Sequence, residues 1–100
     1  MQQEPIFILG SIGAHFRKLA VAKTLADNGR GIPELMRYYG MTDYIARKNL
    51  SAAAKFKSEF YRNAARLVLE ADRKMKTSFD DSERILELLV LQLAQEARNG

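Results

Sequence analysis

The chain has 100 residues, of which 47% are hydrophobic and 28% charged, so it suits one folded domain with a modest core and is unlike a disordered segment. It contains no cysteine, which excludes disulfides and thiolate metal sites. The net charge of +4 is unevenly distributed: residues 14–76 carry fourteen Lys and Arg against six Asp and Glu, whereas residues 77–100 carry two against five. A basic body with an acidic end suits binding to nucleic acid or to an acidic partner, but an unevenly charged solvated surface is the simpler explanation, since no block of consecutive basic residues occurs.

No segment has the character of a membrane span or a signal peptide. The most apolar early stretch, from Ile6 to Ala14, is about half the length that a span needs. It also lacks a basic leader and a cleavage site. We therefore expect a soluble, cytoplasmic chain without membrane contact.

The first predicted helix covers residues 5–28. Pro5 suits a first helical turn, where its missing N–H needs no partner. Gly10 and Gly13 each cost ~1 kcal/mol relative to alanine, which is tolerable if another backbone packs closely there. Asn28 and Gly29 accept positive φ and so end the helix. Its apolar stripe consists of Ile6, Leu9, Ile12, Phe16 and Leu19.

Two shorter helices are predicted over residues 33–39 and 43–56. Gly40 stops the first of them. Thr42 is a favourable N-cap for the second, since its hydroxyl can accept a hydrogen bond from an otherwise unpaired amide. Asp43 is then stabilised by the helix dipole in the first turn.

The last two helices are predicted over residues 58–77 and 81–97. The break before the first of these, near Ser58, has no Gly or Pro to define its position. Asp80 with Glu83 resembles a capping box that opens the final helix. Because strand-like alternation is nowhere sustained, we predict an all-α fold, a compact bundle of about five helices in one domain.

No catalytic constellation is visible in the sequence. The single histidine, His15, lacks the spacing to a glutamate that helical metal sites use. No glycine-rich loop ends in Gly-Lys-Ser/Thr, so a P-loop is unsupported. Asp80 and Asp81 are better explained by stabilisation at a helix N-terminus than by catalysis. We therefore expect no enzyme activity, no metal and no cofactor.

The helix–glycine–helix arrangement over residues 35–55 is also typical of a helix–turn–helix. Its second helix would carry Arg47, Lys48 and Lys55, which could contact phosphates or base edges in a major groove. The same arrangement is a common way to fold a small bundle. A small helix–turn–helix DNA-binding domain is therefore the alternative function.

The final helix is more apolar than a single core requires. Its apolar residues are Ile85, Leu86, Leu88, Leu89, Val90, Leu91 and Leu93. They cover more than half of the circumference, whereas one core needs a stripe of ~100° or a little more. The surplus must be buried centrally or against another chain, and the sequence does not distinguish Leu88, Leu89 and Leu91 for these roles. We predict Leu88 and Leu91 as partner-facing residues.

The preceding helix carries a predicted basic stripe formed by Arg62, Arg66 and Arg73. This stripe is either a solvated face or a contact for an acidic partner. Asp72 and Lys76 lie four residues apart and form, at the least, an ordinary intrahelical ion pair worth ~0.3–0.5 kcal/mol.

Four segments, taken together, carry a family resemblance. They are His15-Phe16-Arg17-Lys18-Leu19, Tyr44-Ile45-Ala46-Arg47-Lys48, Glu70-Ala71-Asp72-Arg73-Lys74-Met75-Lys76 and Ile85-Leu86-Glu87-Leu88-Leu89. In order and spacing the chain resembles the C-terminal domain of the bacterial DNA polymerase III delta subunit over roughly residues 5–95. The resemblance marks Phe16, Arg17, Asp72 and Lys76 as structural residues of the family motif. Residues 40–43 depart from it, because many relatives carry a proline after this turn.

The resemblance implies an assembly role in the sliding-clamp loader. In that family the domain joins the equivalent domains of the gamma/tau and delta prime subunits in a ring-shaped collar, with DNA near the assembled loader. The sliding clamp would be bound only through an N-terminal part that this chain lacks, so we expect an excised C-terminal domain of a longer protein. The parent subunit belongs to the DNA polymerase III holoenzyme, a DNA-directed DNA polymerase and nucleotidyltransferase, but no catalytic residue is expected here.

Overall fold

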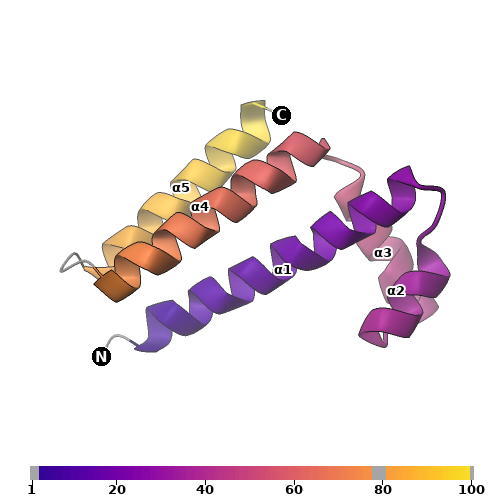
Figure 1. The fold of residues 1–100 in the computed structure, drawn as a ribbon, viewed down its shortest axis with the longest axis horizontal. Coiled ribbons are helices and arrows are strands. Elements are labelled where there is room, and N and C mark those ends of the chain that lie inside the picture. Colours follow the sequence, from indigo (N-terminus) through magenta and orange to yellow (C-terminus); the bar gives the residue numbers. More distant parts are fainter. Residues whose placement is uncertain (1–2, 78–80, 100) are drawn as a thin grey trace.

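The computed structural model describes residues 3–77 and 81–99, which form five α-helices and no strand (Figure 1). The helices are α1 (Gln3–Asp27), α2 (Ile32–Tyr39), α3 (Asp43–Ala53), α4 (Ser58–Thr77) and α5 (Ser82–Asn99). The predicted all-α bundle is thereby confirmed. The main difference in helix bounds is that α3 ends at Ala53 rather than Phe56.

Three long helices form the body of the molecule. Helix α4 runs antiparallel to α1, and α5 returns along α4 and also contacts α1 (Figure 1). The short helices α2 and α3 pack together at the C-terminal end of α1. The molecule measures 45 × 29 × 17 Å, so it is thin in one direction and much of each helix faces solvent.

Two clusters of buried apolar side chains stabilise this arrangement. The first joins the three long helices and includes Leu9, Leu67 and Leu89. The second joins α1 to α2, α3 and the start of α4. Its buried members are Leu19, Ala22, Leu35, Ala46, Ala53, Phe60 and Tyr61. Phe16 contacts both clusters. Its ring meets that of Phe60 edge-on, with 5.8 Å between the ring centres.

Helix α1 ends in the way that its sequence predicts. Gly29 has a φ of 72°, which is the left-handed conformation that glycine adopts without a steric cost. The Arg30 N–H donates to the Leu25 carbonyl at 2.8 Å, and the Gly29 N–H donates to the Ala26 carbonyl at 3.0 Å. This pair of bonds is a Schellman motif, and it satisfies carbonyls that the end of the helix would leave unpaired.

The starts of α3 and α5 are capped by side chains. The Thr42 hydroxyl accepts a hydrogen bond from the Ile45 N–H at 3.2 Å, as predicted. At the start of α5 the Asp81 carboxylate accepts from the Glu83 N–H at 3.0 Å. The predicted capping residue Asp80 lies outside the described residues.

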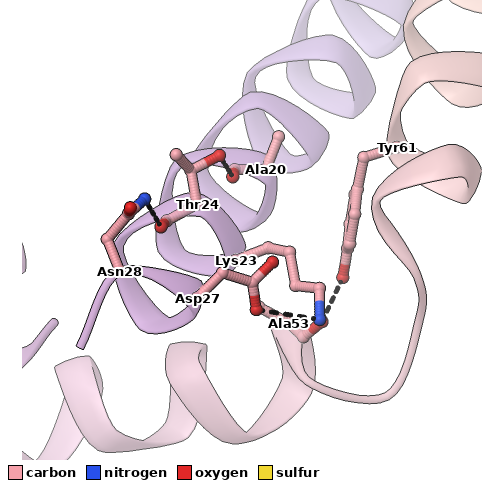
Figure 2. A network of polar contacts seen from close by, with 7 residues as sticks. All are labelled: Ala20, Lys23, Thr24, Asp27, Asn28, Ala53 and Tyr61. Carbon is pink, nitrogen blue, oxygen red and sulfur yellow. Dashed lines mark hydrogen bonds and ion pairs between the residues drawn. The ribbon is translucent and has the colours of Figure 1, made fainter. Parts of the chain in front are cut away.

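Polar contacts also stabilise the C-terminal part of α1 and, separately, the connection between α3 and α4, as Figure 2 shows. Tyr61 is a buried residue of α4. Its hydroxyl donates a hydrogen bond of 2.9 Å to the Ala53 carbonyl at the end of α3. Burial raises the pKa of the Tyr61 hydroxyl, so the group remains a donor over the physiological range. Along α1, Lys23 pairs with Asp27 at 3.3 Å.

The two glycines inside α1 have different surroundings. A Cβ atom on Gly13 would lie 3.3 Å from a methyl of Val68 on α4, so the absence of a side chain permits close packing there. A Cβ atom on Gly10 would meet nothing within 4 Å. The expectation that another backbone packs closely is therefore wrong for both glycines: the neighbour of Gly13 in α4 is a side chain, and beside Gly10 the surface is open.

Candidate functional site

The outer face of α5 carries leucines that the domain itself does not bury. Leu89 is 1% exposed and belongs to the core of the three long helices, whereas Leu88 is 50% and Leu91 is 66% exposed. Because Leu88 and Leu91 are three residues apart, they are neighbours on one face of the helix. Central burial of all the apolar residues of α5 is therefore wrong.

A groove between α4 and α5 borders this apolar face. It has a volume of about 430 Å³, and Leu88 forms part of its wall together with Leu67 and Ile85. Charged residues of both signs, including Glu70 and Lys74, line the remainder. The groove and the exposed leucines thus form one mixed surface, which suits contact with protein better than it suits a small apolar ligand.

The arginines of the predicted basic stripe lie along the exposed side of α4. Arg62, Arg66 and Arg73 are all exposed, and Leu69, 59% exposed, lies among them at helical spacing. Arg66 pairs with Glu70 on the same helix at 3.2 Å. Within residues 3–77 and 81–99, neither Arg62 nor Arg73 has a carboxylate at ion-pair distance. The stripe is therefore an exposed basic ridge with one apolar residue in it.

A second groove, between α1 and α4, brings the four family-motif residues together. Phe16 and Arg17 enter its lining from α1, and Asp72 and Lys76 enter from α4. Lys76 pairs with Asp72 at 3.1 Å, and both side chains are partly exposed, so the pair adds little stability. The volume of this groove is about 560 Å³.

The helix–turn–helix arrangement is present, but its cations are differently placed from the prediction. The Arg47 guanidinium donates to the carboxylate of Asp43 at 2.8 Å, and this carboxylate neutralises the charge of Arg47 locally. The Lys48 ammonium lies 5.3 Å from the centre of the Tyr44 ring. Lys55 follows the end of α3 and lies in the connection to α4. The three residues therefore do not form one row along a recognition helix.

Ionisable groups give little sign of chemistry. The Gly31 N–H donates to the carboxylate of Glu34 at 3.0 Å, and this hydrogen bond is the main cause that lowers the pKa of the Glu34 carboxyl. His15 is exposed and meets the Phe16 ring at 5.8 Å. No group of three potential metal ligands occurs in residues 3–77 and 81–99. Nor does any described helix have the length and apolar character needed to cross a membrane.

Sequence reasoning missed Leu69 and the α1–α4 groove. Arg62, Arg66, Leu69 and Arg73 follow one another at steps of four, three and four, which is the spacing of a helical contact seam. That spacing is a signal that the sequence contains. The groove itself depends on how α1 packs against α4, and no local pattern predicts it.

Comparison with known proteins identifies a family. The family described as DNA polymerase III delta subunit, C-terminal domain, matches residues 1–93. No curated protein and no solved structure matches the chain significantly. The family match covers all four segments that carry the resemblance.

Proposed function

Because the chain belongs to the family formed by the C-terminal domain of the DNA polymerase III delta subunit, we propose that it is an assembly module of the clamp loader. It would bind the corresponding domains of the gamma/tau and delta prime subunits in a collar, so that the loader can place the sliding clamp on DNA. This role would place the chain in the cytoplasm, near DNA but without a catalytic task of its own.

The observation that carries this proposal is the exposed apolar face of α5. Leu88 and Leu91 point outward on a helix whose opposite side, at Leu89, is already buried. Burying a leucine completely is worth ~1.5–3 kcal/mol, so covering these two partly exposed side chains would contribute a few kcal/mol to association. Adjacent exposed apolar residues on a protein surface mark sites of interaction with other proteins.

The basic ridge on α4 complements this face. Arg62 and Arg73 are exposed cations without a described carboxylate partner nearby. Arginine is enriched at protein interfaces because its planar guanidinium group makes several directed hydrogen bonds. We propose that the ridge contacts an acidic surface of a neighbouring subunit, where it would favour encounter and correct orientation.

The proposal is tested by mixing the chain with purified gamma/tau and delta prime subunits and measuring the mass by light scattering after size-exclusion chromatography. We expect a heavier species that contains the chain. Leu91→Glu should weaken this species at least about tenfold, because it places a charge in the buried contact. A chain that remains alone at high micromolar concentration would contradict the proposal.

The matched control is Ile45→Glu. It also replaces an exposed apolar helical residue by glutamate, but on α3. It should leave the mass of the complex unchanged. An equal loss with both variants would indicate a general effect of the added charge rather than a contact at Leu91.

A further inference from the structure

The α1–α4 helix pair has two sides, and only one of them is filled. Helix α5 packs on one side and contacts both helices. On the other side lies the groove that contains Gly10, Gly13 and Leu69. It continues into a second hollow, and the two share the residues Ala20, Tyr61 and Ala65. The two hollows extend along α1 from Ile6 to Thr24, a distance of about 27 Å at 1.5 Å per residue.

The floor of this groove is mainly apolar. Leu9, Phe16 and Val68 line it, and the surface beside Gly10 is open, whereas at Gly13 the Arg17 guanidinium lies 3.5 Å from where a Cβ atom would be. Leu69 forms a border, and it is more than half exposed. A long, shallow, apolar trough between two helices has the shape that accepts the apolar stripe of a third helix.

The borders of the groove are mainly cationic. Arg17, Lys23, Arg62, Lys76 and Asp72 line it, but Lys23 pairs with Asp27 at 3.3 Å and Lys76 pairs with Asp72 at 3.1 Å. Within the described residues, Arg17 and Arg62 have no carboxylate at ion-pair distance. The groove therefore offers apolar contact along its floor and unbalanced positive charge at its edges.

We propose that the α1–α4 groove binds an amphipathic helix of a partner protein, with an apolar stripe and acidic residues on both sides of that stripe. From the length of the groove, the helix would have about 18 residues. The source of this helix, another component of the loader, rests on the proposed function. The chemistry of the helix is inferred from the groove alone. Glutamate and aspartate beside the stripe would pair with Arg17 and Arg62.

A second copy of the chain fits the groove less well. The exposed leucines of its α5 lie on the same side as Arg84, Glu87 and Arg98 at helical spacing, so this face carries charges of both signs. Docked into the groove, that face would bring two arginines and only one glutamate toward Arg17 and Arg62, which is poorer charge complementarity than an acidic helix offers. The charge of the groove therefore favours an acidic partner over self-association.

The test uses three fluorescein-labelled synthetic helices and measures their binding to the whole chain by fluorescence anisotropy. The first has leucines at alternating steps of three and four with glutamates beside them. The second has lysine in place of each glutamate, and the third has the first composition in scrambled order. We expect the acidic helix to bind at least about tenfold more tightly than either of the others, and its affinity to fall as salt is added.

Variants locate the binding. Arg17→Glu and Leu69→Glu should each weaken binding of the acidic helix about tenfold. Lys57→Glu, an exposed charge reversal outside the groove, should leave it unchanged. Circular dichroism checks that each variant is folded, and amide shifts in two-dimensional NMR spectra should concentrate at Gly10, Gly13 and Ala20.

Three results would overturn the inference. The first is equal binding of the acidic and scrambled helices. The second is a loss of affinity in Lys57→Glu equal to that in Arg17→Glu and Leu69→Glu. The third is sedimentation that shows a dimer of the chain dependent on Leu69. If the chain enters the loader complex but binds no acidic helix, the inference fails while the proposed function stands. If it binds the helix but enters no complex, the proposed function fails instead.

Discussion

Replacing Leu89 by alanine is the sharpest test of how α5 divides its leucines between core and surface. Leu89 is 1% exposed and packs among Leu9, Leu67 and Leu93. Removing its side chain would lose the free energy of burial and leave a cavity between three helices, so we expect a cost of ~2–5 kcal/mol. At a cost of ~3 kcal/mol, the melting temperature of a domain of this size should fall by about 12–24 °C.

Urea unfolding followed by far-ultraviolet circular dichroism measures this cost, with Leu91→Ala as the matched control. Leu91 is 66% exposed, so its replacement should change the free energy of unfolding by less than about 0.5 kcal/mol. A cost below about 1 kcal/mol for Leu89→Ala, or equal costs for the two variants, would refute the packing of α5 described above.

Four further outcomes are expected. Gly10→Ala should stabilise the fold by ~0.5–1 kcal/mol in thermal unfolding, because the added methyl meets no neighbour and alanine is the better helix former; destabilisation would mean that this part of the groove is filled. Tyr61→Phe should cost ~1–2 kcal/mol, because it leaves a carbonyl at the end of α3 without its donor; a neutral result would show that water replaces the hydroxyl. The lowered pKa of Glu34 stabilises the fold fully above the usual value of 4.5, and this contribution is lost as the pH falls through the lower folded-state value. The free energy of unfolding of Glu34→Gln should therefore fall less on acidification than that of the unsubstituted chain. An unchanged pH dependence of the free energy of unfolding would contradict this. Duplex DNA should bind weakly and without sequence preference in filter binding, and Arg47→Ala with Lys48→Ala should change this little; tight binding to one sequence with a steep salt dependence would favour the helix–turn–helix alternative.

The fold was predictable because its helix ends depend on local chemistry. Gly29 accepts a positive φ wherever it occurs, and the Thr42 hydroxyl caps the helix that follows it without help from distant residues. The end of α3 was harder to predict, since no Gly or Pro marks it. There, the Tyr61 hydroxyl satisfies the Ala53 carbonyl, and this contact comes from the next helix.

The surfaces were predictable only in part. The excess of apolar residues on α5 showed that some would face outward, but separating Leu88 and Leu91 from Leu89 requires the position of α1 and α4. The convergence of Arg17 with Lys76 on one groove joins residues that are far apart in the chain. Periodicity describes one helix at a time, and it therefore cannot predict a groove between two.

The most direct measurement of the assembly claim is the protection of a single introduced cysteine, because the natural chain has none. In Leu91→Cys, the rate of alkylation of this chain, followed by mass spectrometry, should fall at least about tenfold when the gamma/tau and delta prime subunits are added. In Ile45→Cys the rate should not change. Equal alkylation rates of Leu91→Cys with and without those subunits would contradict the claim that this face of α5 is buried by a neighbouring subunit.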